Sequence, residues 1–119
     1  MKIVVTAQGE SLSSQVDPRF GRAKHFIVVD TETDAFVVHS NAHNLDAAQG
    51  AGIQAGRAIV DLGVAAVITG HVGPKAFTAL QAGQVKVYAG ASGTIEEVLQ
   101  KFKAGQLQSA DGADVEGHW

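Results

Sequence analysis

The sequence predicts an α/β fold built on a mixed five-stranded sheet flanked by helices. Three β-branched segments, at residues 2–6, 25–30 and 35–40, come first and have no helical pattern between them. From residue 47 onward, segments with helical spacing alternate with short apolar runs, which is typical of βαβ units. Such units pair their strands in parallel through right-handed crossovers, whereas the early segments resemble a meander, so the sheet should be mixed.

Size and composition favour one ordinary globular domain. The chain has 119 residues, of which 45% are hydrophobic and 18% charged, and its formal charge of −3 gives no reason to expect nonspecific binding to nucleic acid. It contains no cysteine, which rules out disulfides, thiolate metal ligands and thiol nucleophiles. We see no signal peptide and no run of about 18 apolar residues, so we expect a cytoplasmic protein without a membrane partner.

A long loop follows the first strand. Residues 7–24 have no sustained period and contain three serines, two glycines and Pro18, and a connection of this length in a compact domain is more often functional than not. The loop carries a basic cluster in an otherwise acidic chain, formed by Arg19, Arg22 and Lys24.

The next two strands, at residues 25–30 and 35–40, are separated by four polar residues. This spacing predicts a hairpin, in which the two strands are antiparallel neighbours. A polar loop that contains His43 follows at residues 41–46.

The second half of the chain alternates helices and strands. We expect a helix at 47–62, a strand at 65–69, a helix at 74–82, a strand at 85–88 and a last helix that begins with the capping box Thr94-Ile95-Glu96-Glu97. Residues 109–119 have three acids and no period, so we assign 1–108 to the domain and 109–119 to a flexible tail.

Glycines interrupt the helical pattern of residues 47–62. Gly50, Gly52 and Gly56 would each cost this helix roughly 1 kcal/mol relative to alanine, so something should offset them. Close packing of a smooth helix on the sheet is one explanation. Close approach of a ligand to the backbone at Gly50 and Gly52 is the other.

A second glycine pattern, Gly70-His71-Val72-Gly73-Pro74, lies between an apolar strand and a helix. Proline suits the first helical position, and free N–H groups at a helix start favour an anion. The pattern matches neither the Walker loop nor the dinucleotide fingerprint, and glycine used only for turn geometry would explain it equally.

These patterns together resemble one family. They are Ser14-x-Val16-x-x-x-Phe20-Gly21-Arg22-Ala23, Gly50-Ala51-Gly52, Gly70-x-x-Gly73-Pro74, Val87-Tyr88 and Thr94-x-Glu96-Glu97. The chain resembles the nitrogenase iron–molybdenum cofactor biosynthesis family over about residues 1–107, and in lacking cysteine it is closest to the orange-protein branch found in sulfate reducers.

The resemblance implies a ribonuclease-H-like sheet and a protein that binds or carries an anionic metal–sulfur cluster without covalent attachment. The cluster would be a molybdenum–copper sulfide or an iron–molybdenum type, and other proteins would take part in its delivery. Because inorganic sulfur already saturates the metals, the protein need supply only cations, backbone N–H groups and apolar contact. The expected binding residues are Arg19, Phe20, Gly21, Arg22, Lys24, His43, Gly50, Gly52, Gly70, His71, Val72 and Gly73.

Other interpretations remain open. Arg22 would equally form an ion pair with an acid such as Asp17, and a lone loop histidine such as His43 or His71 is commonly just solvated. A glycine-rich anion loop serves phosphates as well as sulfides, so a nucleotide-binding or protein-interaction module is the alternative function. We expect no enzymatic activity, because the first strand lacks the acid that a two-metal hydrolase needs and the other carboxylates do not obviously converge.

Overall fold

The computed structural model describes residues 1–42 and 51–110. Five strands form one sheet in the order β3-β2-β1-β4-β5. The strands are β1 (Lys2–Ala7), β2 (His25–Asp30), β3 (Phe36–Ser40), β4 (Ala66–Ile68) and β5 (Lys86–Tyr88). The helices in the described part are α2 (Ala51–Asp61), α3 (Pro74–Ala82) and α4 (Ile95–Lys103).

The sheet is mixed, as the sequence predicts. β1, β4 and β5 run parallel to one another, and β2 is antiparallel to both of its neighbours, β1 and β3. Element boundaries differ from the predicted ones by at most one residue, apart from the start of the first long helix. Residues 47–50, where we predicted that start, lie outside the described residues. The ribonuclease-H-like arrangement implied by the resemblance stays a prediction.

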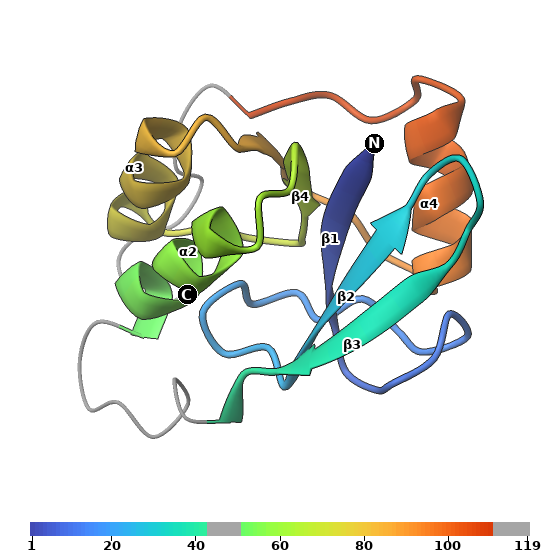
Figure 1. Cartoon of the computed structure of the whole chain (residues 1–119), viewed down its shortest axis with the longest axis horizontal. Coiled ribbons are helices and arrows are strands. Elements are labelled where there is room, and N and C mark those ends of the chain that lie inside the picture. The colour runs from blue at the N-terminus through green and yellow to red at the C-terminus, as the bar shows by residue number, and fades with distance from the viewer. Residues whose placement is uncertain (43–50, 111–119) are drawn as a thin grey trace.

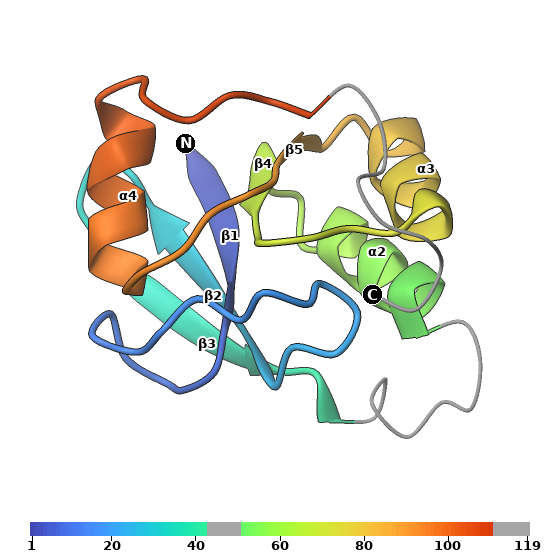
Figure 2. The same ribbon diagram turned by 180° about the vertical axis from the view of Figure 1, so that it is seen from behind.

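The sheet is the middle of three layers. α2 and α3 cover one face and α4 covers the other, as Figure 1 and the opposite view in Figure 2 show. In the central strand β1, Val4 points to the α2/α3 side, whereas Ile3 and Val5 point to the α4 side, and all three are fully buried. A strand covered on both faces should be apolar at consecutive positions, which is why this segment shows no alternation with polar residues.

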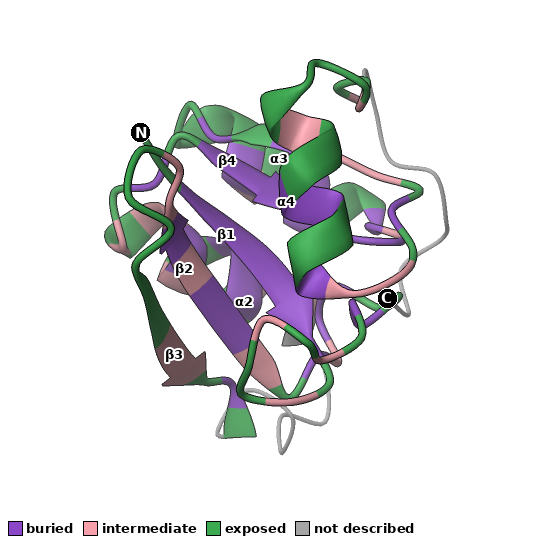
Figure 3. Ribbon diagram, turned by 90° about the vertical axis from the view of Figure 1, so that its right-hand side faces the viewer, coloured by how far each residue is buried: buried purple, intermediate pink, exposed green. Residues whose placement is uncertain are grey.

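The two cores differ in the helices that complete them. On one side Ala55, Ile59 and Leu80 pack against the strands, and on the other Ile95 and Leu99 do so. Burial follows the layers, with the central strands and the inner helix faces buried (Figure 3).

Local sequence signals explain how the helices end and begin. Gly63, which follows α2, has φ +72, a conformation that suits glycine and stops the helix. Thr94 and Glu97 form the predicted capping box at the start of α4: the Glu97 N–H donates to Thr94 Oγ1 at 3.1 Å, and the Thr94 N–H donates to Glu97 Oε1 at 3.1 Å.

The chain after α4 returns to the sheet. Ser109 pairs with Tyr88 in an isolated antiparallel bridge, and the Ala110 N–H donates to the Val87 carbonyl oxygen at 2.7 Å. These two residues, which we expected to begin the tail, therefore lie along β5. Residues 111–119 lie outside the described part of the chain. In that part no helix is long and apolar enough to cross a bilayer.

Candidate functional site at the carboxyl edge of the parallel strands

The loops that the sequence singles out meet at one edge of the sheet. β1 and β4 are adjacent and parallel, so their carboxyl ends open side by side. β1 leads into the basic loop and β4 leads into the glycine-rich turn at residues 69–73. The carboxyl edge of parallel strands is where open α/β sheets bind ligands.

Backbone hydrogen bonds join the two loops directly. The His71 N–H donates to the Pro18 carbonyl oxygen at 2.7 Å, and the Phe20 N–H donates to the His71 carbonyl oxygen at 3.1 Å. Arg19 and His71 thereby form a short parallel bridge between segments that are more than 50 residues apart in sequence. The basic loop is fixed against the turn that starts α3.

Gly70 is required by this close approach. A Cβ atom at position 70 would lie 2.6 Å from Pro18 Cα and 2.7 Å from the Pro18 carbonyl oxygen. Such contacts are too short for any side chain, and both involve backbone atoms that cannot rotate away. The pattern Gly70-x-x-Gly73 therefore has a structural reason at its first position, whatever binds nearby.

A buried polar cluster, made of Thr6, Asp17 and Thr69, lies beneath the two loops. The hydroxyl oxygens of Thr6 and Thr69 are 2.8 Å apart, and the Thr6 hydroxyl is 2.8 Å from the Asp17 carbonyl oxygen that accepts from it. Thr6 and Thr69 are fully buried, and Asp17 is 4% exposed. The cluster holds the ends of β1 and β4 and the start of the basic loop in register, and our sequence analysis did not identify it.

Asp17 and Asn41 shape the two ends of the basic segment. Asp17 Oδ1 accepts a hydrogen bond from the Arg19 N–H at 3.0 Å, a local turn that an Asp-Pro pair commonly forms. The buried Asn41 donates from Nδ2 to the Ala23 carbonyl oxygen at 2.8 Å, and its N–H donates to the Lys24 carbonyl oxygen at 3.0 Å. Asn41 is a second positioning residue that sequence reasoning missed, because asparagine in a polar loop gives no distinguishing signal.

The three cations have different surroundings. Arg19 and Lys24 are exposed, and Arg22 is half-buried. Asp17 does not form an ion pair with Arg22, although both residues lie in the described part of the chain. The pair with Asp17 is thus absent among the described residues, although Arg22 is not without a partner.

Two of the predicted site residues belong to the core. The side chains of Phe20 and Val72 are fully buried, and the Phe20 ring stacks on Phe26 with centroids 6.1 Å apart. These two residues therefore support the loops from within the core and expose no surface to a ligand at this edge. The neighbouring Gly21 and Gly73 are also buried.

The glycine-rich turn ends at the start of α3. Gly73 is the N-cap and Pro74 the first helical residue, and no side chain caps this helix in the described part of the chain. The first hydrogen bond of the helix runs from the Phe77 N–H to the Gly73 carbonyl oxygen at 3.0 Å. The N–H groups that precede Phe77 in the first turn have no acceptor within the helix, and with the helix dipole they favour an anion.

The glycines of the long helix have separate roles. Gly56 faces α3, where a Cβ atom would lie 3.2 Å from Ala79 Cβ, so this glycine lets two helices approach closely, rather than a helix and the sheet as we expected. Gly52 lies in the first turn of α2 and is half-buried. Gly50 and His43 lie outside the described residues, so their predicted roles at the site stay predictions.

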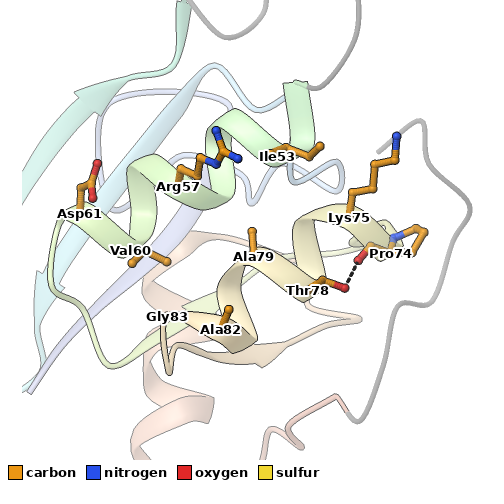
Figure 4. Close-up of a pocket in the computed structure, with 10 residues that line it drawn as sticks. All are labelled: Ile53, Arg57, Val60, Asp61, Pro74, Lys75, Thr78, Ala79, Ala82 and Gly83. Atoms are coloured by element: carbon orange, nitrogen blue, oxygen red, sulfur yellow. Dashed lines mark hydrogen bonds between the residues drawn. The ribbon is translucent and has the colours of Figure 1, made fainter.

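A groove of about 720 Å³ lies between α2 and α3, next to the start of α3. Its lining is mainly apolar, and Figure 4 shows the side chains of Arg57 and Lys75 extending from the two facing helices on the same side, with Asp61 toward the other end. The side chains of Arg57 and Lys75 form no ion pair or hydrogen bond within the described residues. The groove was not predicted, because helical spacing alone does not show which two helix faces leave a gap.

The described residues contain no group of three or more histidine, aspartate or glutamate side chains arranged to hold a metal ion. The candidate site therefore consists of cations, backbone groups and His71 at the sheet edge.

Fold and site together define a small α/β protein in which a basic loop and an uncapped, glycine-rich helix start share one edge of a mixed sheet. A family model described as dinitrogenase iron-molybdenum cofactor matches residues 1–105. The chain belongs to this family.

Solved structures and a curated relative agree with the assignment. The apo form of the orange protein from Desulfovibrio gigas is 42% identical, with 96% of each chain covered and a TM-score of 0.94. A putative NifB protein from Thermotoga is 35% identical, with 98% of each chain covered and a TM-score of 0.82. An uncharacterized protein of Methanocaldococcus jannaschii is 29% identical over 112 residues, which are 91% of this chain and 90% of the relative.

Proposed function

We propose that this protein binds and carries an anionic metal–sulfur cluster, held noncovalently at the edge where the basic loop meets the start of α3. The observation that carries the proposal is the backbone bridge between Arg19 and His71, because it brings the cations of one loop beside the helix start of the other. Family membership and the likeness to the orange protein support a cluster as the cargo.

The site's chemistry suits such a cargo. Arg19, Arg22 and Lys24 supply positive charge, the first turn of α3 supplies N–H donors, and His71 supplies a further donor or a ligand. Since inorganic sulfide saturates the metals of such a cluster, no cysteine is needed. A molybdenum–copper sulfide is the cluster that we propose first, with an iron–molybdenum type as the other candidate, and a recipient protein would take it from this edge.

The test removes the charge of the loop. Purified native protein and the double variant Arg19→Ala/Arg22→Ala are incubated with tetrathiomolybdate and copper, desalted at low and at high salt, and analysed for retained molybdenum and copper. Charge-assisted contacts of partly exposed groups are screened by solvent, so we expect the variant to hold the cluster about tenfold more weakly. Salt should weaken the native complex more than that of the variant.

A matched control removes the same charge elsewhere. Lys2 and Lys86 are exposed at the amino ends of β1 and β5, the opposite edge of the sheet. The variant Lys2→Ala/Lys86→Ala should retain metal like the native protein. Equal retention by native protein and the arginine variant would remove the basic loop from the site.

The alternative function is a module that binds a phosphate-containing ligand or another protein and carries no metal. The α2/α3 groove favours it, because Arg57 and Lys75 stand beside an apolar surface without partners in the described part of the chain. Titration with inorganic phosphate and ATP, followed by calorimetry, separates the two functions. Saturable nucleotide binding that Lys75→Ala abolishes, together with no metal retention, would favour the alternative.

A further inference from the structure

α2 and α3 lie side by side and touch at two levels. A Cβ atom added to Gly56 of α2 would lie 3.2 Å from Ala79 Cβ, and one added to Gly83, just after α3, would lie 2.4 Å from Val60 Cγ2. Residues 56 and 60 thus face 79 and 83 in the same order, so the two helices are parallel. Because they are already in contact, the groove between their outer faces cannot be closed by packing the helices more tightly.

The groove presents small apolar groups to solvent. Its apolar lining is formed by Ile53, Val60, Pro74, Ala79, Ala82 and Gly83. Each of these residues is exposed or half-buried. A groove of this kind between two helices accepts a row of side chains from a third helix, as in helix-in-groove recognition.

Two charged residues in the lining oppose the dipoles of their own helices. Lys75 is the second residue of α3 and Asp61 is the last residue of α2, whereas a helix favours anions at its start and cations at its end. The first turn of α3 has no acidic residue and the last turn of α2 has no basic one, so nothing in either turn compensates. α4 has the favourable arrangement, with acids first and bases last. Charges that oppose a local rule without a local gain are typical of functional sites.

These charges give the groove a polarity along its length. Lys75 lies where the two helices begin, Arg57 extends on the same side, and Asp61 lies toward the end where the helices finish (Figure 4). The parallel helix dipoles add to this polarity, positive at the first end and negative at the second. The side chains of Arg57, Lys75 and Asp61 form no ion pair within the described residues, so all three charges are available to a partner.

We propose that the α2/α3 groove is the docking site for an amphipathic helix of a partner protein. The apolar stripe of that helix fills the groove, an acidic residue lies beside Arg57 and Lys75, and a basic residue lies beside Asp61. Asp61 follows Arg57 by one helical turn and lies two turns beyond the level of Lys75, so the partner's acid and base are about 6–12 Å apart along its axis. A small anion would bind only the cations and would leave the apolar lining and Asp61 unused.

The groove lies next to the start of α3, so a docked partner would lie beside the candidate site at the sheet edge. The inference holds whether or not that edge carries a cluster. The variant Arg19→Ala/Arg22→Ala of the cluster test should bind the partner helix like native protein. Failure of the cluster proposal and failure of the docking proposal are therefore distinguishable.

The test uses a phage-displayed library of amphipathic helical peptides, selected against native protein. We expect the enriched peptides to carry an acid and a base at the stated spacing beside their apolar stripe. The strongest binder is synthesised with a fluorophore and titrated by fluorescence anisotropy. The variant Lys75→Glu/Asp61→Lys reverses the polarity of the groove at constant net charge and should bind this peptide roughly tenfold more weakly. A peptide with its acid and base exchanged should regain the affinity for this variant.

The same variant should melt at a higher temperature than native protein, because both charges then agree with the helix dipoles. Lost binding would therefore not be a loss of fold. The matched control Glu96→Lys/Lys101→Glu makes the same exchange on α4, at the other face of the sheet, and should melt lower yet bind the peptide like native protein.

Three outcomes would overturn the proposal. They are a library that yields no binder, enriched peptides without the paired acid and base, and a selected peptide that binds native protein and Lys75→Glu/Asp61→Lys equally. Displacement of the peptide by inorganic phosphate alone would also overturn it, because the cations would then account for the binding.

Discussion

At the scale of single residues, backbone proximity decides which side chains are allowed at the candidate site. Gly70 lies directly against the Pro18 backbone, and the hydroxyls of Thr6 and Thr69 meet beneath it. The positions that shape the site are thus small or buried residues, whereas the cations above them are exposed or half-buried. Shape and charge at this edge therefore come from different residues and can be changed separately.

We predict that Gly70→Ala destabilises the protein by about 1–3 kcal/mol, because the added methyl group forces the Pro18 segment to move. Thermal unfolding followed by circular dichroism measures the loss. Pro18→Ala should not rescue this variant, since Pro18 Cα and the carbonyl oxygen, which remain, make the two shortest contacts. A Gly70→Ala protein as stable as the native one would show that the two loops have room to separate.

At the scale of elements, α4 shows how a short helix is fixed by its first turn. The capping box links Thr94 and Glu97, and Lys101 and Lys103 lie in the last turn, where cations favour the helix dipole. The backbone hydrogen bond from Thr94, with the hydrogen bond from its side chain, lowers the pKa of the Glu97 carboxyl from its ordinary value of 4.5. The charged form of Glu97 is therefore the one that caps the helix.

We predict that Thr94→Ala lowers the free energy of unfolding by about 1 kcal/mol at neutral pH.

The contribution of Glu97 to stability should depend on pH. Because folding lowers the pKa of the Glu97 carboxyl, this group contributes to the free energy of unfolding above pH 4.5, and the contribution is lost as the pH falls through the lowered pKa. The stability difference between native protein and Glu97→Gln should then shrink as the solution is acidified. Urea unfolding at several pH values measures the difference in free energy of unfolding between the two proteins. If that difference stays constant down to strongly acidic pH, the charged form of Glu97 is not the one that caps α4.

At the scale of the whole molecule, the chain returns to the sheet after α4, and Ser109 and Ala110 lie along β5. The Ala110 N–H bonds to β5 and the Ala110 side chain packs against the α2/α3 core, so these contacts are lost when the chain ends at Gln108. The flexible tail stays a prediction for the residues beyond Ala110.

We predict that a chain ending at Ala110 melts at the native temperature, whereas one ending at Gln108 melts lower, because it loses a backbone hydrogen bond and an apolar contact of β5. Differential scanning calorimetry of the three proteins is the measurement. If the chain ending at Ala110 also loses several degrees, residues 111–119 contribute to stability and the tail prediction is wrong.

Local patterns in the sequence were enough to predict the strands, the helices and the mixed pairing of the sheet. These features depend on local periodicity, capping residues and the short hairpin link, all of which operate over a few neighbouring residues. The crossover rule then placed the basic loop and the glycine-rich turn at one edge of the sheet. For the same reason Arg19 and His71 could be assigned to one site before any contact was known.

Tertiary contacts determine which of those residues face outward and which residues hold them in place. Phe20 and Val72 proved to be core residues, Gly70 proved to be needed for contact with Pro18, and Asn41 proved to anchor the basic loop. The groove of Arg57 and Lys75 likewise had no signal in the sequence. Burial and close approach depend on segments distant in the chain, and local patterns carry no information about the distance between them.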